Sequence, residues 1–314
     1  MKTIKRILCS TDLTFDSEEA LLYALALARA FKAKLLVCHA VESEPLTAEL
    51  RIQIEHELTT AVKAQASRDV PKAELPEWES IIVAGEASEV ITREAAERHA
   101  DLIVMRSRHR SYAATLLGST AEAVCHQAPC PVLVTHPRER EWVDGSIREI
   151  VLRRILMAHD FSTDSEAALM FALSLAHEFD ATLHLLHVIP SSSQPEIADT
   201  ESAMLLAESD FHRAISELEE AVPAEAVQQC EIRYAARTGA AWREILAYAE
   251  EHEVDLICLG FSGAGFDKGE LAGSNADQVL REASCPVLIA RPPKPASFVL
   301  AESRAEALQP ELQA

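Results

Sequence analysis

The sequence predicts an α/β protein made of two tandem, doubly wound domains, each with a five-stranded parallel sheet. Two observations carry this prediction. The chain repeats itself, because residues 5–41 and 153–189 align without gaps and 17 of 37 positions are identical. In each copy, short continuous apolar runs alternate with segments of helical periodicity, which is typical of a parallel sheet covered by helices on both faces.

The elements are clearest in the second copy. The apolar run "RILMAH" is an expected strand that stops before Asp160, and Ser162 and Asp164 follow as helix-starting residues. The next stretch, "SEAALMFALSLAHEF", has apolar residues at helical spacing and predicts a helix. Further strands are expected in "ATLHLLHVIP", "CEIRYAAR", "DLICLG" and "CPVLIA", and further helices at about 197–221, in "AAWREILAYAEEHE" and at 274–283.

The two copies also end alike, in "APCPVLVTHP" and "ASCPVLIARP". These matching ends and the charged segment between the copies set the expected boundaries. The expected parts are a first domain at 1–138, a linker at 139–150, a second domain at 151–293 and a C-terminal tail at 294–314.

Composition limits the kinds of function. The net charge of −21 argues against broad nucleic-acid binding, which needs a basic surface. No apolar run approaches the roughly 18 residues of a membrane span, and Asp12 interrupts the N-terminal stretch too early for a signal peptide, so we expect a cytoplasmic protein. The seven cysteines are odd in number and form no CxxC pair, which predicts buried, reduced thiols and no cysteine metal site.

A glycine-rich stretch, "LGFSGAGFDKGELAGSN", follows the fourth strand of the second copy. Gly260 ends that strand, and Gly273 and Ser274 open the next helix. Glycine in such places lets the backbone approach a ligand and adopt a positive φ, and the N–H groups of the helix start can hold phosphate oxygens. Neither GxxxxGK[ST] nor GxGxxG is present, so the glycines alone are a weak indication.

Together with the first-strand aspartate, the "HVI" strand end and the closing "CPVLIARP", this stretch resembles the universal stress protein family. The nucleotide-binding members of that family carry G-x2-G-x9-G-[ST]. The resemblance covers nearly all of both copies. It implies a Rossmann-like fold of the adenine nucleotide alpha hydrolase type and an ATP site in the second domain, with Mg²⁺ as a candidate companion of the nucleotide.

The resemblance also assigns the site. In the family, residues around the first-strand aspartate contact the nucleoside, and the residue after the second-strand histidine meets adenine through its backbone. It implies no catalytic residue and no metal ligand. The implied nucleotide-binding residues are Ala158, His159, Asp160, Val188, Leu259, Gly260, Gly263, Gly273, Ser274 and Asn275.

The first copy departs from the pattern. It keeps Gly118 and Ser119, but Met105 and Arg108 stand where the first two glycines are expected. Their side chains would fill the phosphate space, so we expect no ATP there in the usual pose. The cluster of Arg106, Arg108 and Arg110 leaves two alternatives open: a site for another anion or for the partner domain, or a decayed site with a solvated loop.

Other candidates have structural alternatives. Asp160 could be only a helix N-cap. Of the histidines, His184 and His187 are three apart on a strand and so point to opposite faces, which favours hydrogen bonding over a zinc cluster with His159.

Three functions are compared. The first is a stress-response or regulatory protein that binds ATP in its second domain; a slow ATPase and a nucleotide-independent binding module are the alternatives. The resemblance implies that the last strands, "PVLV" and "PVLI", pair the two domains within the chain, and it leaves a homodimer open. Neither a nucleic acid nor a membrane is expected as a partner.

Overall fold

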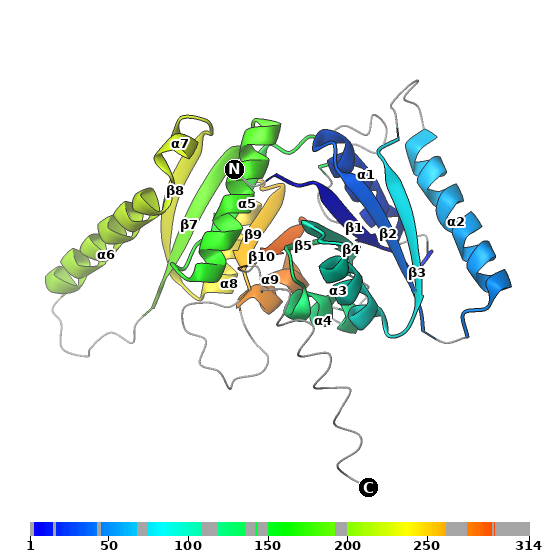
Figure 1. The fold of residues 1–314 in the computed structure, drawn as a ribbon. Helices are drawn as coiled ribbons and strands as arrows, with labels where there is room; N and C mark the ends of the chain where they lie inside the picture. The colour runs from blue at the N-terminus through cyan, green and yellow to red at the C-terminus, as the bar shows by residue number, and fades with distance from the viewer. Residues whose placement is uncertain are drawn as a thin grey trace, which may run out of the picture. The chain divides into compact units, whose positions relative to one another are not determined.

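A computed structural model describes residues 3–14, 17–42, 45–67, 75–107, 118–135, 142–143, 150–191, 200–261, 275–290 and 292. Strands and helices alternate along both copies, coloured from blue to green in the first and from green to orange-red in the second (Figure 1). The first copy contains β1 (Arg6–Ser10), α1 (Glu18–Ala30), β2 (Lys34–Val41), α2 (Ala48–Ser67), β3 (Trp78–Ala84), α3 (Ala87–Glu97), β4 (Leu102–Arg106), α4 (Ser119–Gln127) and β5 (Val132–Thr135).

The second copy repeats this order with one addition. It contains β6 (Arg154–Ala158), α5 (Thr163–Phe179), β7 (Thr182–Pro190), α6 (Thr200–Ala221), α7 (Ala224–Val227), β8 (Ile232–Gly239), α8 (Ala241–Glu251), β9 (Leu256–Gly260), α9 (Asn275–Glu282) and β10 (Val287–Ala290). Each strand expected in this copy is present. The short helix α7 was not predicted, because four residues are too few to show a helical period.

The described residues form two compact units, which we treat separately. One holds β1 to β4 and α1 to α4, with strand order β3-β2-β1-β4. The other holds the second copy together with most of β5, with strand order β5-β10-β9-β6-β7-β8. The last strands of the two copies, β5 and β10, are thus neighbours in the strand order, which agrees with the expected pairing.

Parallel pairing connects β1 to β2 and β4, and it connects β6 to β7 and β9. The central strands are buried along almost their whole length, because helices cover both faces. This architecture confirms the predicted doubly wound α/β fold. Within the residues described, no helix is both long enough and apolar enough to cross a membrane.

Two details refine the sequence picture. Part of the expected linker is packed, since Trp142 and Val143 are almost fully buried and Val143 forms an antiparallel bridge with Ile150. All seven cysteines are thiols and six of them are buried, with Cys230 partly exposed, as the composition predicted. Burial raises the pKa of Cys38 to about 12, so this thiol is inert at neutral pH.

Candidate functional site

The candidate site lies at the carboxyl ends of β6 and β9. Strand β6 lies between β7 and β9; the chain continues from β6 to β7 and from β9 to β10, so it leaves these two neighbouring strands in opposite directions. Such a point is where open α/β sheets leave a crevice for ligands. Ala158, the last residue of β6, is in register with Leu186 on one side and with Leu259 on the other. Gly260 follows Leu259 directly and ends β9.

His159 and Asp160 continue from the end of β6. The His159 N–H donates to the Leu186 carbonyl at 2.8 Å, and the Phe161 N–H donates to His159 Nδ1 at 3.2 Å. Because Nδ1 accepts, the ring proton of the neutral form is on Nε2. His159 is 3% exposed, and burial, the largest effect, lowers its pKa to about 4 although the Asp160 carboxylate opposes this. The side chain is therefore neutral at physiological pH.

Asp160 shapes the turn into α5. Its Oδ1 accepts from the Ser162 N–H at 3.1 Å and from the Ser162 hydroxyl at 2.5 Å. Ser162 is the N-cap of α5, and its hydroxyl oxygen accepts from the Ser165 N–H at 3.2 Å. The N-cap of α5 is therefore Ser162, and the sequence alternative that Asp160 is only the helix N-cap is wrong. Asp160 positions the cap through the turn.

The equivalent turn in the first copy has the same geometry. Asp12 Oδ1 accepts from the N–H and the hydroxyl of Thr14, at 2.9 and 2.5 Å. The residues that follow the two aspartates, Leu13 and Phe161, have φ of 61° and 63°. The aspartate turn thus does not distinguish the two copies.

Gly260 does distinguish them, for a reason that the sequence did not give. A Cβ on Gly260 would lie 2.6 Å from Ser165 N and 2.7 Å from the Asp164 carbonyl carbon, both in the first turn of α5. Its φ lies outside the left-handed region. The expectation of a positive φ is therefore wrong at Gly260, and what requires glycine there is the close approach of the helix backbone.

The remaining implied residues are partly placed. Val188 lies in β7, two residues beyond Leu186, and pairs with Arg237 of β8. Asn275 begins α9, and its side-chain oxygen accepts from the Trp242 N–H at the start of α8, at 3.2 Å. The contact described for Asn275 is thus to α8 and not to the strand ends. Gly263, Gly273 and Ser274 lie outside the described residues, so their role stays a prediction.

At the corresponding strand end, the carboxyl end of β4, the first copy carries larger side chains. The strand register places Arg106, the last residue of β4, at the position of Gly260, because Val104 pairs with Cys9 as Cys258 pairs with Met157. The expectation that Met105 replaces Gly260 is therefore wrong; Met105 matches Leu259 and is buried. Arg106 forms an ion pair with Glu19 of α1, and their side chains are 9% and 19% exposed. The Arg106 guanidinium is thus engaged by a carboxylate of its own unit. Arg108 and Arg110 lie outside the described residues.

Glu19 was missed by the sequence argument, although comparing the two copies could have found it. At the equivalent positions the second copy has Ala167 in place of Glu19 and Gly260 in place of Arg106. The acid and the base are both present in one copy and both absent from the other. This is the pattern expected of residues in contact.

The histidines of β2 and β7 have structural partners. The pairs His39 Nδ1 with the Thr11 carbonyl and His187 Nδ1 with the His159 carbonyl are at 2.9 and 2.8 Å. His184 Nδ1 lies 2.9 Å from the Tyr248 hydroxyl. His184 and His187 thus form hydrogen bonds of the kind that the sequence favoured, and His39 repeats the contact of His187.

The fold and the position of the site identify a doubly wound α/β protein with its candidate site at the switch point of the sheet. The chain belongs to the universal stress protein family, which it matches over residues 3–136 and 152–291. It is of the tandem type, with two such domains in one chain.

Individual relatives agree. A universal stress protein of Thermus aquaticus is 34% identical over 138 residues, which cover 41% of this chain and 97% of the relative. One of Methanocaldococcus jannaschii is 28% identical over 149 residues, covering 46% of this chain and 86% of the relative. Among solved structures, a universal stress protein from Archaeoglobus fulgidus aligns with a TM-score of 0.63 and 22% identity, covering 92% of this chain and 97% of its own.

Proposed function

We propose that the second domain binds ATP at the carboxyl ends of β6 and β9, and that the chain is a stress-response or regulatory protein controlled by this nucleotide. The observation that carries the proposal is the meeting of Ala158, Leu259 and Gly260 at the switch point of the sheet. Family members that bind nucleotide carry the glycine pattern that begins at Gly260. Mg²⁺ accompanies the nucleotide in this proposal.

The roles of the site residues follow from their places. Ala158, His159 and Asp160 follow the strand end where a nucleoside would lie, and Val188 offers its backbone from β7. Gly263, Gly273, Ser274 and Asn275 belong to the loop and helix start that would hold phosphates through N–H groups. In this proposal Gly263 and Gly273 leave the loop backbone accessible, Gly260 allows the close approach of α5, and Asp160 and Ser162 keep the start of α5 in place.

The first domain does not bind ATP in this proposal. Arg106 places a side chain where the second copy has only Gly260, and its guanidinium is paired with Glu19. A cation already neutralised by a neighbouring carboxylate is a poor anion receptor. The protein is thus asymmetric, with one working site in two similar domains.

The test is a count of bound nucleotide. The purified chain is denatured, and released adenine nucleotide is measured by chromatography, before and after incubation with ATP and Mg²⁺. We expect about one nucleotide per chain, because the glycine pattern is kept in the second copy and lost from the first. The variant Gly263→Arg, which copies Arg108, should lose the nucleotide and keep the circular dichroism spectrum of the parent.

A matched variant sharpens the count. Arg108→Gly restores one glycine of the first copy but leaves Arg106, which stands at the place of Gly260 and is paired with Glu19, so the count should not rise. A parent chain that releases no nucleotide even after incubation would contradict the proposal and favour a nucleotide-independent module. Steady conversion of ATP to ADP that stops in Asp160→Ala would favour the slow ATPase instead.

A further inference from the structure

A second cluster of polar side chains lies far along the sheet from the candidate site, at the amino end of β7. His184 is the third residue of this strand and is 2% exposed beneath α8. Its Nδ1 lies 2.9 Å from the hydroxyl of Tyr248 in α8. Among the described residues, no group forms a hydrogen bond with His184 Nε2.

Aromatic rings contact one another around the C-terminal end of α8. The ring of His252, the C-cap of α8, stacks on Tyr248 with centroids 3.9 Å apart and planes 13° apart. The His184 ring meets both at an edge-to-face angle, with centroids 5.7 Å from Tyr248 and 5.4 Å from His252. On the other side, the Arg237 guanidinium lies 4.8 Å from the Tyr248 ring centre and pairs with Glu251. Three elements, β7, β8 and α8, thus meet through these side chains.

The surroundings of His184 oppose a positive charge. Burial is the largest effect that lowers its pKa, to about 4, and His252, Arg233 and Arg154 lower it further. Glu231 is the carboxylate that acts in the opposite direction. Arg154 donates to the His252 carbonyl at 2.8 Å, so a cation is fixed close to the cluster.

Protonation would also break the hydrogen-bond pattern. Neutral His184 can accept from the Tyr248 hydroxyl, but an imidazolium has two N–H donors and no acceptor. One of the two, at Nε2, has no acceptor among the described residues. A buried charged donor without a partner is strongly unfavourable, and moving α8 away would let water reach it.

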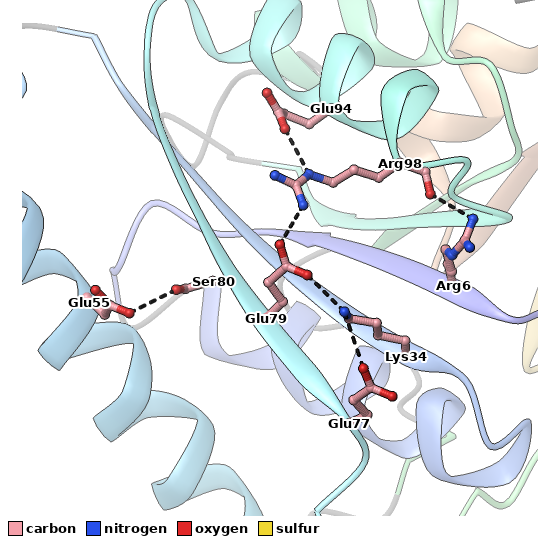
Figure 2. Close-up of polar contacts among 8 residues, drawn as sticks. All are labelled: Arg6, Lys34, Glu55, Glu77, Glu79, Ser80, Glu94 and Arg98. Carbon is pink, nitrogen blue, oxygen red and sulfur yellow. Dashed lines mark hydrogen bonds and ion pairs between the residues drawn. The ribbon is translucent and has the colours of Figure 1, made fainter.

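The first copy holds the equivalent helix by different chemistry. Leu36 of β2 takes the position of His184. Leu36 pairs with Glu79 of β3, whereas His184 pairs with Arg233 of β8. Figure 2 shows Arg98, the C-cap of α3, reaching Glu94 at 2.9 Å and Glu79 at 2.5 Å, while Lys34 pairs with Glu79 at 2.9 Å. Lys34, the largest influence, lowers the pKa of Glu79, so these acid–base pairs persist in mild acid.

We propose that His184, Tyr248 and His252 form an acid-sensitive latch, which holds α8 on the sheet at neutral pH and releases it when His184 takes up a proton. The N-terminus of α8 donates the Trp242 N–H to Asn275, so release would reach the start of α9. That consequence for the nucleotide loop rests on the proposed function; the latch itself does not.

The test is hydrogen exchange of α8 amides in the nucleotide-free chain, corrected for the intrinsic pH dependence of exchange. When α8 is open, His184 regains an ordinary pKa of about 6.5. The opening constant of α8 should therefore rise about 30-fold between about pH 7.5 and about pH 5. Helix α3 of the same molecule is the internal control, and its opening constant should stay nearly constant.

Variants assign the effect to the latch. In His184→Leu/Tyr248→Phe, which copies Leu36 and removes both polar atoms, the rise should fall below about 3-fold. His184→Gln keeps a polar side chain that cannot titrate, and it should abolish the rise even if the double variant folds poorly. His159→Thr, which removes another buried histidine of the same domain, should keep the full rise. An α8 that responds to pH no more than α3, or a rise that survives in the glutamine variant, would overturn the latch.

Discussion

Gly260→Ala tests whether α5 is what requires glycine at the end of β9. The added methyl carbon would lie 2.6 Å from Ser165 N and 2.7 Å from the Asp164 carbonyl carbon. Both are backbone atoms of a helix whose buried face packs on the sheet, so neither can turn aside as a flexible side chain would. Contact at an ordinary distance needs a shift of the helix start by roughly 0.8 Å or more, given the ~3.5 Å at which such atoms pack.

The expected cost is about 2–3 kcal/mol, the usual range for overpacking a well-packed interior. Urea unfolding followed by exchange of amides in the second copy is the suitable assay, because a two-domain chain need not unfold in one step. Met105→Leu in the first copy, which copies Leu259, is the control. It conserves side-chain volume and should cost less than about 1.5 kcal/mol.

The outcome also bears on binding. A displaced helix start moves Ser162, and with it the turn that Asp160 holds, so nucleotide content should fall together with stability. If Gly260→Ala unfolds within about 0.5 kcal/mol of the parent, the close approach to α5 is not what selects glycine, and the packing argument is refuted.

Three further predictions concern other parts of the chain. Arg106→Ala leaves the largely buried Glu19 without its cation and should destabilise the first copy by about 2–3 kcal/mol in urea unfolding. The double variant Arg106→Gly/Glu19→Ala, which copies Gly260 and Ala167 of the second domain, should recover most of this loss. Equal loss in both variants would exclude the ion pair as the cause. His159 has a pKa of about 4 in the folded chain, below its unfolded value of about 6.5. Its neutral form therefore adds stability that is complete above about pH 6.5 and is lost as the pH falls toward 4. In unfolding curves measured at several pH values, His159→Thr should remove about 2–3 kcal/mol of this acid destabilisation, and unchanged curves would contradict the prediction. A thiol reagent should label Cys230 first in the native chain and all seven cysteines only after unfolding. Burial raises the pKa of the Cys38 thiol to about 12, so fast labelling of Cys38 in the native chain would contradict this prediction.

Much of the fold follows from the sequence alone. The duplication, the continuous apolar strands and the helical periodicity between them are local patterns, and they sufficed for the order of the elements and for the parallel sheet. The strand ends are predicted as well, so the sequence by itself places Ala158 and Gly260 at the ends of β6 and β9. Family resemblance added the nucleotide, which stays a proposal.

Tertiary structure decided what these residues contact. The glycine at 260 is required by the start of α5, a helix that begins about a hundred residues earlier in the chain. The ion pair of Arg106 with Glu19 and the hydrogen bond of His184 with Tyr248 likewise join residues from different elements. Local patterns indicate which face of a helix or strand is buried. Which side chains meet across the core depends on how the helices pack on the sheet, and this is decided only in the folded chain.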